Sequence, residues 1–274
     1  MTLRLGLIAG EGSLPALCAR GAAGQGYEVI GIALSDAARE ELAPLSARVY
    51  RLGIGQANKI LACLKKEQIR QILMIGKIHK GLLFSRPALD LRALKILRRL
   101  RNQNDMTIFQ AIVQEMEKEG MEILEQSRFL GDLIPRPGSL TRGKLTVREQ
   151  EDVDFGFGLA KAVAGLDIGQ TVVVKEKTIV AVEALEGTDD AIDRGCRLAG
   201  EGAVVVKVSR PRQDLRFDLP AVGLRTVEAM AAGKASVLAV EAGSTLVLDR
   251  PRAVERAQQC GIKLVAVTGS KARG

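Results

Sequence analysis

Short apolar runs alternate along this chain with segments long enough to form helices. Four such runs lie in its first third, at residues 5–9, 29–34, 48–52 and 71–77. A glycine-rich turn follows the first run, and a helix is expected at residues 57–65. Apolar strands joined by helices are typical of a parallel sheet that is covered on its faces. The first half of the chain therefore predicts an α/β domain with a Rossmann-like parallel sheet.

The second half continues the alternation and adds a hairpin. Two apolar runs within residues 170–185, with a charged turn at 175–177, predict a pair of antiparallel strands. Further helices are expected at 149–164, 188–199, 226–232 and 251–260, and further strands at 203–208, 236–243, 244–249 and 263–269. These elements predict a second, mixed-sheet α/β domain, and we expect a substrate cleft between the two domains.

A change in composition marks the expected domain boundary. Residues 132–146, DLIPRPGSLTRGKLT, hold two prolines and two glycines among polar residues, with no periodic pattern. The expected organisation is a first domain at 1–132, a linker at 133–146, a second domain at 147–270 and a short tail at 271–274.

The composition disfavours several classes of function. The chain has no Trp and only 3% aromatic residues, so aromatic platforms for single-stranded nucleic acid are not expected, and we predict no nucleic-acid partner. The single histidine, His79, excludes zinc sites built from several histidines, and its place between two lysines favours a phosphate contact or a surface position over a catalytic base. A formal charge of +8 attracts polyanions such as phosphorylated small molecules or anionic lipid surfaces.

Cysteine spacing and hydropathy predict a cytoplasmic protein. The four cysteines form no CxxC pair and are expected to be buried thiols in a reducing compartment. The N-terminal segment reaches glycine too early for a signal peptide, and no run approaches the ~18 apolar residues of a membrane span.

The first candidate site is the turn AGEGSLP after the first strand. Gly10 and Gly12 permit a tight turn and a close backbone approach, and the helix that follows presents free N–H groups to an anion. Asp36 lies where a ribose-binding acid would follow the second strand. Pro15 stands where the dinucleotide fingerprint has a third glycine, so a nucleotide or phosphate contact through this turn and Ser13 competes with a purely structural turn.

The second candidate site is an acidic segment, VEALEGTDDAIDRG, at the start of an expected helix. Its acids are Glu183, Glu186, Asp189, Asp190 and Asp193. A cap by Thr188 and favourable acids in the first helical turn account for Asp189 and Asp190, but not for Glu183 near the end of an apolar strand. Carboxylates without His or Cys suit a hard ion such as Mg²⁺.

The third candidate site is KVSRPRQDLRFDLPAVG, residues 207–223, which follows a buried strand. Charge falls at every second position, at Arg210, Arg212, Asp214, Arg216 and Asp218. We expect an extended segment that places both signs of charge on one face. Guanidinium groups bind phosphate in bidentate fashion, and an acid can hold a metal ion or orient water. A row of weak surface salt bridges is the alternative.

Six segments in this order carry a resemblance to a known family: IAGEGSLP, NDMTIFQAI, DIGQTVVV, VEALEGTD, KVSRPRQDLRFDLPAVG and VEAG. They resemble the LpxI-type UDP-2,3-diacylglucosamine pyrophosphatases of Gram-negative lipid A synthesis, over nearly the whole chain. The resemblance implies two domains that hold the substrate between them and a magnesium-dependent hydrolase. Its products would be UMP and 2,3-diacylglucosamine 1-phosphate (lipid X), formed when water attacks the phosphorus on the sugar side.

The resemblance and the residue patterns together suggest site residues. The essential aspartate of the family's DLP motif corresponds to Asp218, and we expect Asp214 and Arg216 to act in catalysis beside it. Magnesium ligands are expected at Asp218, Glu183 and Asp189. The expected substrate-binding residues are Gly10, Gly12, Ser13, Lys77, Gln170, Thr188, Lys207, Arg210, Gln213 and Glu241.

The chain departs from the family pattern at three places. NDM at 104–106 stands where family members have Gly-Asp-Asp, which leaves one acid, Asp105. Ala191 replaces a methionine after the EGTD segment. Arg210 replaces a lysine and Arg212 a glycine, so the phosphate-binding charge at position 210 is kept with a different reach.

Two other functions stay open at this point. The glycine turn also suits a nicotinamide- or flavin-dependent oxidoreductase, and the site residues also suit a non-catalytic module that binds nucleotide-sugars. The expected partners are a lipid-linked UDP-sugar and, transiently, the inner-membrane surface, and a homodimer stays open. The amphipathic stretch 90–101 is expected to face either the core or that membrane.

Overall fold

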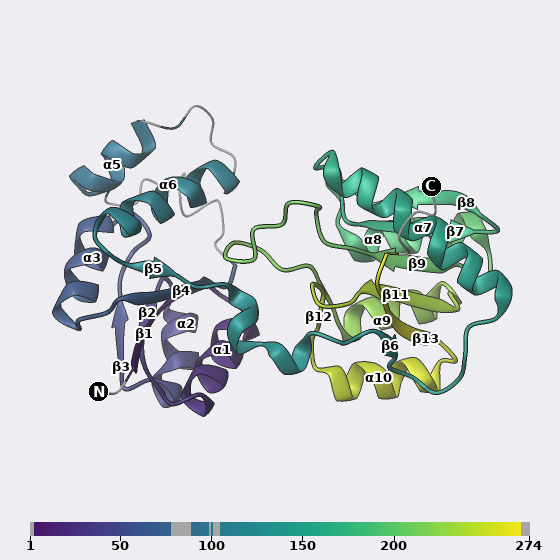
Figure 1. The fold of residues 1–274 in the computed structure, drawn as a ribbon, viewed down its shortest axis with the longest axis horizontal. Helices are drawn as coiled ribbons and strands as arrows, with labels where there is room; N and C mark the ends of the chain where they lie inside the picture. Colours follow the sequence, from purple (N-terminus) through teal and green to yellow (C-terminus); the bar gives the residue numbers. More distant parts are fainter. Residues whose placement is uncertain (1–2, 78–88, 99, 101–104, 270–274) are drawn as a thin grey trace. The chain divides into compact units, whose positions relative to one another are not determined.

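The computed structural model describes residues 3–77, 89–98, 100 and 105–269, so His79 and Asn104 lie outside the described residues. By the contacts between its residues the chain forms two compact units (Figure 1). The first unit holds Met1–Leu130 together with Asp214–Asp218, and the second holds Gly131–Gln213 and Leu219–Gly274. The short segment Asp214–Asp218, expected within the range 147–270, therefore has its contacts mainly with the N-terminal unit.

The first unit is built on a five-stranded sheet, in the order β3-β2-β1-β4-β5, in which every neighbouring pair is parallel. Its strands are β1 (Leu3–Ala9), β2 (Tyr27–Ala33), β3 (Arg48–Arg51), β4 (Gln71–Ile75) and β5 (Glu122–Ile123). Its described α-helices are α1 (Ser13–Gly24), α2 (Asp36–Leu42), α3 (Ala57–Lys66), α5 (Leu91–Arg98) and α6 (Asp105–Lys118). Isoleucines of β1, β2 and β4 pack with α3 and α6 in one apolar core. The predicted Rossmann-like parallel sheet is confirmed.

The second unit is built on a six-stranded mixed sheet, in the order β6-β13-β11-β9-β7-β8, with β9, β11 and β13 parallel. Its strands are β6 (Gly138–Ser139), β7 (Thr171–Lys175), β8 (Thr178–Val182), β9 (Val204–Lys207), β11 (Val237–Glu241) and β13 (Lys263–Val267). A separate parallel pair joins β10 (Ala221–Val222) and β12 (Leu246–Val247). The predicted mixed-sheet α/β domain is confirmed.

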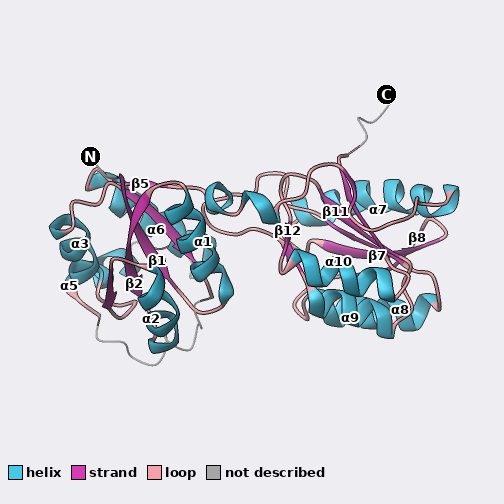
Figure 2. Cartoon of the chain, turned by 90° about the horizontal axis from the view of Figure 1, so that it is seen from below, coloured by secondary structure: helices cyan, strands magenta, loops and turns pink. Residues whose placement is uncertain are grey.

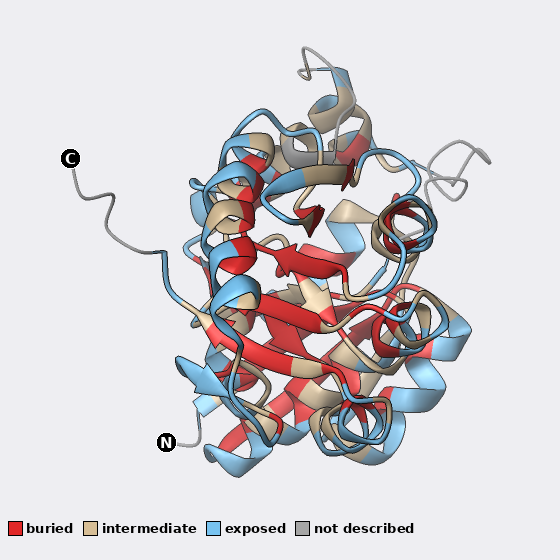
Figure 3. Ribbon diagram, turned by 90° about the vertical axis from the view of Figure 1, so that its right-hand side faces the viewer, coloured by how far each residue is buried: buried red, intermediate tan, exposed pale blue. Residues whose placement is uncertain are grey.

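Helices cover both faces of this second sheet. They are α7 (Val147–Gly165), α8 (Thr188–Ala199), α9 (Leu224–Ala232) and α10 (Arg250–Gln259). One apolar core joins the sheet to α7, and another joins it to α8, α9 and α10. Figure 2 shows α7 on one side of the strands and the other three helices on the opposite side. Because both faces are covered, the central strands are buried along most of their length (Figure 3), which explains their unbroken apolar runs.

The expected linker contains a strand, and the amphipathic stretch 90–101 contains a helix that is only partly buried. β6 lies inside the expected linker 133–146 and pairs antiparallel with β13 at the edge of the second sheet. Within the amphipathic stretch, helix α5 covers Leu91–Arg98; among these residues only Ala93 is buried, and Leu91 is 82% exposed. Its other described leucines are half-buried, so α5 is not a core helix in the sense of α3 or α6.

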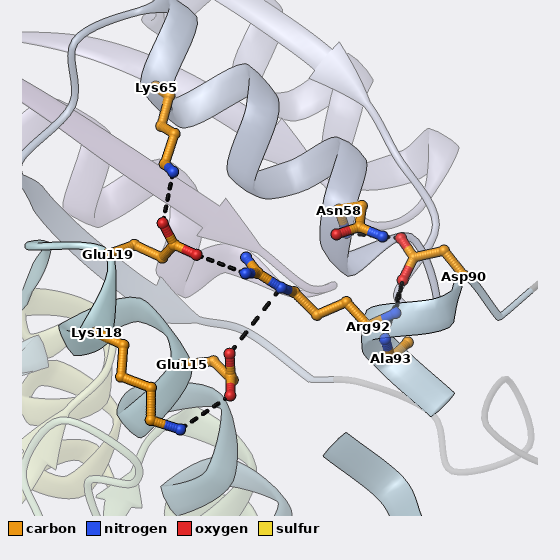
Figure 4. A network of polar contacts seen from close by, with 8 residues as sticks. All are labelled: Asn58, Lys65, Asp90, Arg92, Ala93, Glu115, Lys118 and Glu119. Carbon is orange, nitrogen blue, oxygen red and sulfur yellow. Dashed lines mark hydrogen bonds and ion pairs between the residues drawn. The ribbon is translucent and has the colours of Figure 1, made fainter. Parts of the chain in front are cut away.

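A polar network attaches α5 to its neighbours (Figure 4). Asp90 caps the helix by accepting from the backbone N–H groups of Arg92 and Ala93, and its second oxygen accepts from the N–H of Asn58 in α3. The Arg92 guanidinium lies 2.6 Å from Glu119 just after α6. A pocket of about 230 Å³ lies beside Arg92 and Asn58. Polar contacts therefore attach helix α5 to its neighbours, and its apolar residues other than Ala93 remain partly exposed.

The hairpin of the second unit depends on one buried carboxylate. Glu176 and Lys177 at the turn between β7 and β8 both have positive φ, 49° and 55°, which the twist of a two-residue hairpin requires. Asp152 of α7, only 6% exposed, accepts from the backbone N–H groups of both residues at 3.0 and 2.6 Å. Asp152 therefore stabilises a turn whose left-handed backbone conformation is unfavourable for residues with side chains.

Replacing Asp152 by alanine is expected to lower the free energy of unfolding by about 1–3 kcal/mol, because two N–H groups lose a charged acceptor. Urea denaturation measures the change. Asp154→Ala, at an exposed position of the same helix, is the matched control and is expected to change stability by no more than about 0.5 kcal/mol. Equal effects of the two substitutions would contradict this role.

A second buried carboxylate joins β3 to the loop before β4. Glu67 is 3% exposed. Its Oε1 accepts from the Tyr50 hydroxyl at 2.5 Å and from Arg48 at 3.0 Å, and its Oε2 lies 3.7 Å from Arg4. The hydrogen bond from Tyr50, followed by the arginine contacts, lowers the pKa of Glu67 below its ordinary value despite the opposing effect of burial.

This lowered pKa predicts a loss of stability in acid. Because the folded state favours the carboxylate, its contribution is fully present above the unfolded pKa, about 4.3, and is lost as the pH falls through the lower folded pKa. The difference in unfolding free energy between the unaltered chain and Glu67→Gln is therefore expected to shrink below about pH 4.3. Glu40→Gln, at an exposed position of α2, is the control. A difference independent of pH would refute the prediction.

Candidate active site

The glycine turn closes against the end of β4. Gly10 donates its N–H to Ile75 O at 2.9 Å, and Glu11 and Lys77 exchange two backbone hydrogen bonds at 2.9 and 2.8 Å. A Cβ at Gly10 would lie 2.5 Å from Lys77 O. Gly10 is therefore required by the close approach of two loops within the protein, whatever ligand the turn contacts.

Gly12 differs from Gly10 because nothing lies within 4 Å of where its Cβ would be. It has φ 102° and precedes the first residue of α1, Ser13. Pro15, in the first turn of α1, packs against Gly76. A Cβ added at Gly76 would lie only 2.9 Å from the Pro15 ring. Where the dinucleotide fingerprint has its third glycine, this chain therefore has a proline that packs against the glycine after β4.

The charged segment is not extended, because a turn folds it around Asp214. The N–H groups of Phe217 and Asp218 donate to Asp214 O at 2.9 and 3.2 Å, and the N–H of Arg216 donates to Asp214 Oδ1 at 3.0 Å. The expectation of an extended strand with aligned charges is therefore wrong. Aspartate side chains that bond to the backbone two residues ahead favour turns over strands, and Asp214 does this here.

Within this turn Arg216 pairs with Asp214. The guanidinium Nε lies 3.0 Å from Asp214 Oδ1 and Nη2 lies 2.9 Å from Oδ2. The hydrogen bond from Arg216 lowers the pKa of Asp214, and the same bond raises the pKa of Arg216. Asp214 is therefore a carboxylate held by a permanent cation. Asp218, half-buried, follows this pair and ends the turn.

A chain of polar contacts lies at one edge of the second sheet, where β9 ends. Lys207 is only 6% exposed and donates to the hydroxyl of Thr188, the first residue of α8. That hydroxyl donates to Glu183 Oε1 at 2.8 Å, and Glu183 Oε2 lies 3.3 Å from the backbone N of Gln170. Four residues expected to act at the site, from three separate segments of the sequence, therefore form one group.

A second group lies at the ends of β9 and β11. Lys161 of α7 lies 3.0 Å from both carboxylate oxygens of Glu241 and donates to Ser209 O at 2.8 Å. Glu241 Oε2 accepts from both the N–H and the hydroxyl of Ser209 at 2.7 Å. Glu241 was expected to bind substrate, and its charge is already engaged within the protein. Lys161 and Ser209 were missed, although a single lysine among small apolar residues in FGLAKAVAG was a signal.

The residues after Ser209 form a turn of their own. Arg210 donates its N–H to Gln213 Oε1 at 3.1 Å, and its Nε lies 2.7 Å from Asp167 Oδ1. Gln213 N donates back to Arg210 O at 3.1 Å. The next arginine, Arg212, is exposed. The turn therefore presents two guanidinium groups, one oriented by Asp167 and one in solvent.

Two of the acids expected to bind metal contact different residues. Asp189 in α8 lies 3.4 Å from the hydroxyl of Thr226 and 3.5 Å from Arg225, whereas Glu183 belongs to the Lys207 group. In the described part of the chain, no three acidic, histidine or cysteine side chains gather closely enough to hold a metal ion. Magnesium binding by Asp218, Glu183 and Asp189 stays a prediction.

The two α/β domains, with polar side chains gathered where strands of the second sheet end, place the chain in the class of two-domain α/β proteins. Within this class, the amino-acid sequence identifies the family to which the chain belongs. Family models described as the LpxI N-terminal domain and the LpxI C-terminal domain match residues 4–133 and 136–265. The chain belongs to the LpxI family. It is similar to a protein of Caulobacter vibrioides named UDP-2,3-diacylglucosamine pyrophosphatase LpxI, with 31% identity over 96% of this chain and 97% of that protein.

Two solved structures show a low level of similarity to this chain. A glycinamide-RNase-transformylase T from Mycobacterium tuberculosis shares 16% identity over 66% of this chain and 44% of its own, with a TM-score of 0.26. An N5-carboxyaminoimidazole synthetase from Staphylococcus aureus shares 13% identity over 75% of this chain and 46% of its own, also with a TM-score of 0.26. Likenesses of this size carry no argument about function.

Proposed function

We propose that this protein hydrolyses the pyrophosphate bond of UDP-2,3-diacylglucosamine in lipid A synthesis, with Mg²⁺ as cofactor, to give UMP and 2,3-diacylglucosamine 1-phosphate. Membership of the LpxI family and the name of the Caulobacter relative support the reaction. The observation that carries the proposal is the turn at Asp214–Asp218. It holds Asp218, the aspartate of the DLP motif, directly after a carboxylate–guanidinium pair.

Asp218 has the central role in this proposal. A half-buried carboxylate at the end of a fixed turn is suited to hold a metal ion or to orient the attacking water. Asp214, kept ionised by Arg216, is suited to shape the turn, and the N–H groups of Arg216 beyond those that Asp214 uses are suited to bind a phosphoryl oxygen. Carboxylate oxygens are the donors that Mg²⁺ prefers, and Glu183 keeps lone pairs beyond the two that Thr188 and Gln170 use. When bound, the ion would neutralise charge on the phosphoryl oxygens.

The remaining site residues are proposed to bind the substrate. Lys207 and Arg210 are suited to the diphosphate because each is a cation oriented by a second side chain. The turn at Gly12 and Ser13 is suited to a phosphate because nothing occupies the space beside Gly12. Glu241 would act through Ser209 and the following turn. We assign Lys77, Gln170, Thr188 and Gln213 supporting contacts. The predicted cleft between the domains stays a prediction.

The protein is proposed to act in the cytoplasm and to touch the inner membrane transiently, because its substrate is lipid-linked. Helix α5 supports this through the exposed Leu91 and the basic residues Lys95 and Arg98. None of the helices in the described residues has the length and apolar character needed to cross a bilayer. A homodimer stays a prediction.

The test is an assay of UMP release from UDP-2,3-diacylglucosamine, with and without a chelator. Release that stops with chelator and returns with excess Mg²⁺ is the expected result. Tight UDP-sugar binding without UMP release would favour the non-catalytic module instead. Saturable binding of NAD(P)H without hydrolysis would favour an oxidoreductase.

A further inference from the structure

Gln126 is a buried polar residue to which the proposed function gives no role. It opens a short 3₁₀ helix (Gln126–Phe129) and is 5% exposed. Its side-chain nitrogen donates to the carbonyl oxygens of Met74 at 2.8 Å and Phe217 at 2.9 Å, with a longer contact to Arg216 O at 3.4 Å. Its backbone N–H donates to Leu215 O at 2.8 Å. One residue therefore binds the end of β4 and three successive carbonyls of the segment Asp214–Asp218.

Side chains of α6 hold the same segment from another direction. The ring centroids of Phe217 and Phe109 lie 4.8 Å apart with planes tilted by 47°, and Phe217 packs against the core of the first unit. The guanidinium of Arg216 lies 3.5 Å from Glu117 Oε1. These contacts hold side chains of the segment, whereas Gln126 binds backbone carbonyl oxygens of the segment.

The position of these bonds matters because of peptide planarity. The carbonyl of Phe217 and the N–H of Asp218 belong to one rigid peptide plane. Gln126 holds the carbonyl end of this plane, and Asp214 O accepts from the N–H end at 3.2 Å. Because both ends are bonded, rotation of the plane is opposed, and this restricts the direction in which Asp218 leaves the backbone. Without the Gln126 amide the carbonyl end of the plane would lose this donor.

We propose that Gln126 is a positioning residue that acts on the reaction through Asp218 by fixing the peptide plane between Phe217 and Asp218. The inference rests on the proposed function, because it takes Asp218 as the reacting carboxylate. It assigns no contact between Gln126 and the substrate. Loss of the amide would therefore lower the rate of the chemical step and leave substrate binding nearly unchanged.

The kinetic test replaces Gln126 by methionine, which keeps the length of the side chain and removes the donors. We expect kcat to fall about 10–100-fold with KM changed no more than about twofold, since small misplacement of a reacting group is costly. Gln150→Met is the matched control, because the Gln150 amide is exposed and donates to Asp154 Oδ1 at 2.8 Å within α7, away from both the segment and the 3₁₀ helix that carries Gln126. An unchanged kcat in Gln126→Met, or an equal fall in the control, would overturn the inference.

Amide hydrogen exchange supplies a readout that does not need the substrate. In Gln126→Met the amides of Phe217 and Asp218 are expected to exchange about tenfold faster. The amides of β1, in the central sheet of the first unit, are expected to exchange at an unchanged rate. If the chain does not hydrolyse UDP-2,3-diacylglucosamine, the proposed function fails, yet exchange still decides whether Gln126 holds the segment. Unchanged exchange would overturn the inference even where the hydrolase activity is present.

A second variant covers the case in which Gln126→Met does not fold. Gln126→Asn keeps the amide but is one methylene shorter, so it cannot reach both Met74 O and Phe217 O from the same backbone position. We expect the same pattern at smaller size, with kcat lowered about 3–10-fold and KM nearly constant. Activity equal to that of the unaltered chain in a folded Gln126→Asn would reject the role.

Discussion

Replacing Asp218 by asparagine is expected to lower kcat by about 10³–10⁴-fold while leaving the fold intact. Asparagine has the shape of aspartate but lacks the charge that would hold Mg²⁺ or orient water. The fold is expected to survive because the turn bonds to Asp218 through its backbone N–H, which the substitution keeps. UMP release measures the rate, and circular dichroism with thermal unfolding checks the fold.

The control for this prediction is an acid of the same kind outside the site. Asp193 lies on the exposed side of α8 and pairs with Arg197 one turn later at 3.2 Å. Asp193→Asn is expected to leave kcat within about twofold, since pairs of this type contribute little. Turnover like that of the unaltered chain in a folded Asp218→Asn variant would remove Asp218 from the mechanism.

Replacing Lys161 by methionine is expected to lower the free energy of unfolding by about 3 kcal/mol. The side chains of Lys161 and Glu241 are 25% and 17% exposed, so the substitution leaves a largely buried carboxylate without its cation. It also removes the donor to Ser209 O. Because Ser209 begins the turn that carries Arg210, activity is expected to fall with stability. Urea denaturation measures the stability change.

Two further variants test the cause of this loss. Lys161→Met combined with Glu241→Gln is expected to recover much of the stability, because a neutral amide oxygen still accepts from Ser209 without a buried charge. Lys177→Met removes one partner of an exposed pair, Lys177 and Glu151, which are 56% and 49% exposed at 3.0 Å. It is expected to cost less than about 1 kcal/mol. A cost for Lys161→Met no larger than this would contradict the role of the pair.

Local patterns predicted the regular elements well. Helix α8 begins and ends at the expected residues, and the hairpin of β7 and β8 turns where its charged residues stand. The alternation of short apolar strands with helices predicted the parallel sheet of the first unit, although it did not predict the order of its strands. These features depend on interactions between neighbours in sequence, which periodicity and turn residues record.

The site was predicted as a set of residue types and not as a set of contacts. The sequence identified Glu183, Thr188 and Lys207, and they meet at one edge of the second sheet. It did not identify Lys161, which bonds to Glu241 across 80 positions in sequence. Alternating charge in residues 210–218 predicted a strand, but Asp214 turned the backbone by bonding to it. A local hydrogen bond from a side chain to the backbone can therefore form a turn where alternating residues predict a strand.

The sequence by itself determined the fold class, the positions of most helices and strands, and the membership of the LpxI family. Only the tertiary structure decided which unit holds Asp214–Asp218 and which side chains orient it. The physical reason is that Gln126 and Arg216 lie 90 residues apart in sequence. A hydrogen bond between residues so far apart in sequence produces no periodic pattern in either segment. Whether a carboxylate is poised to react depends on such bonds, so chemistry at Asp218 is a property of the folded chain.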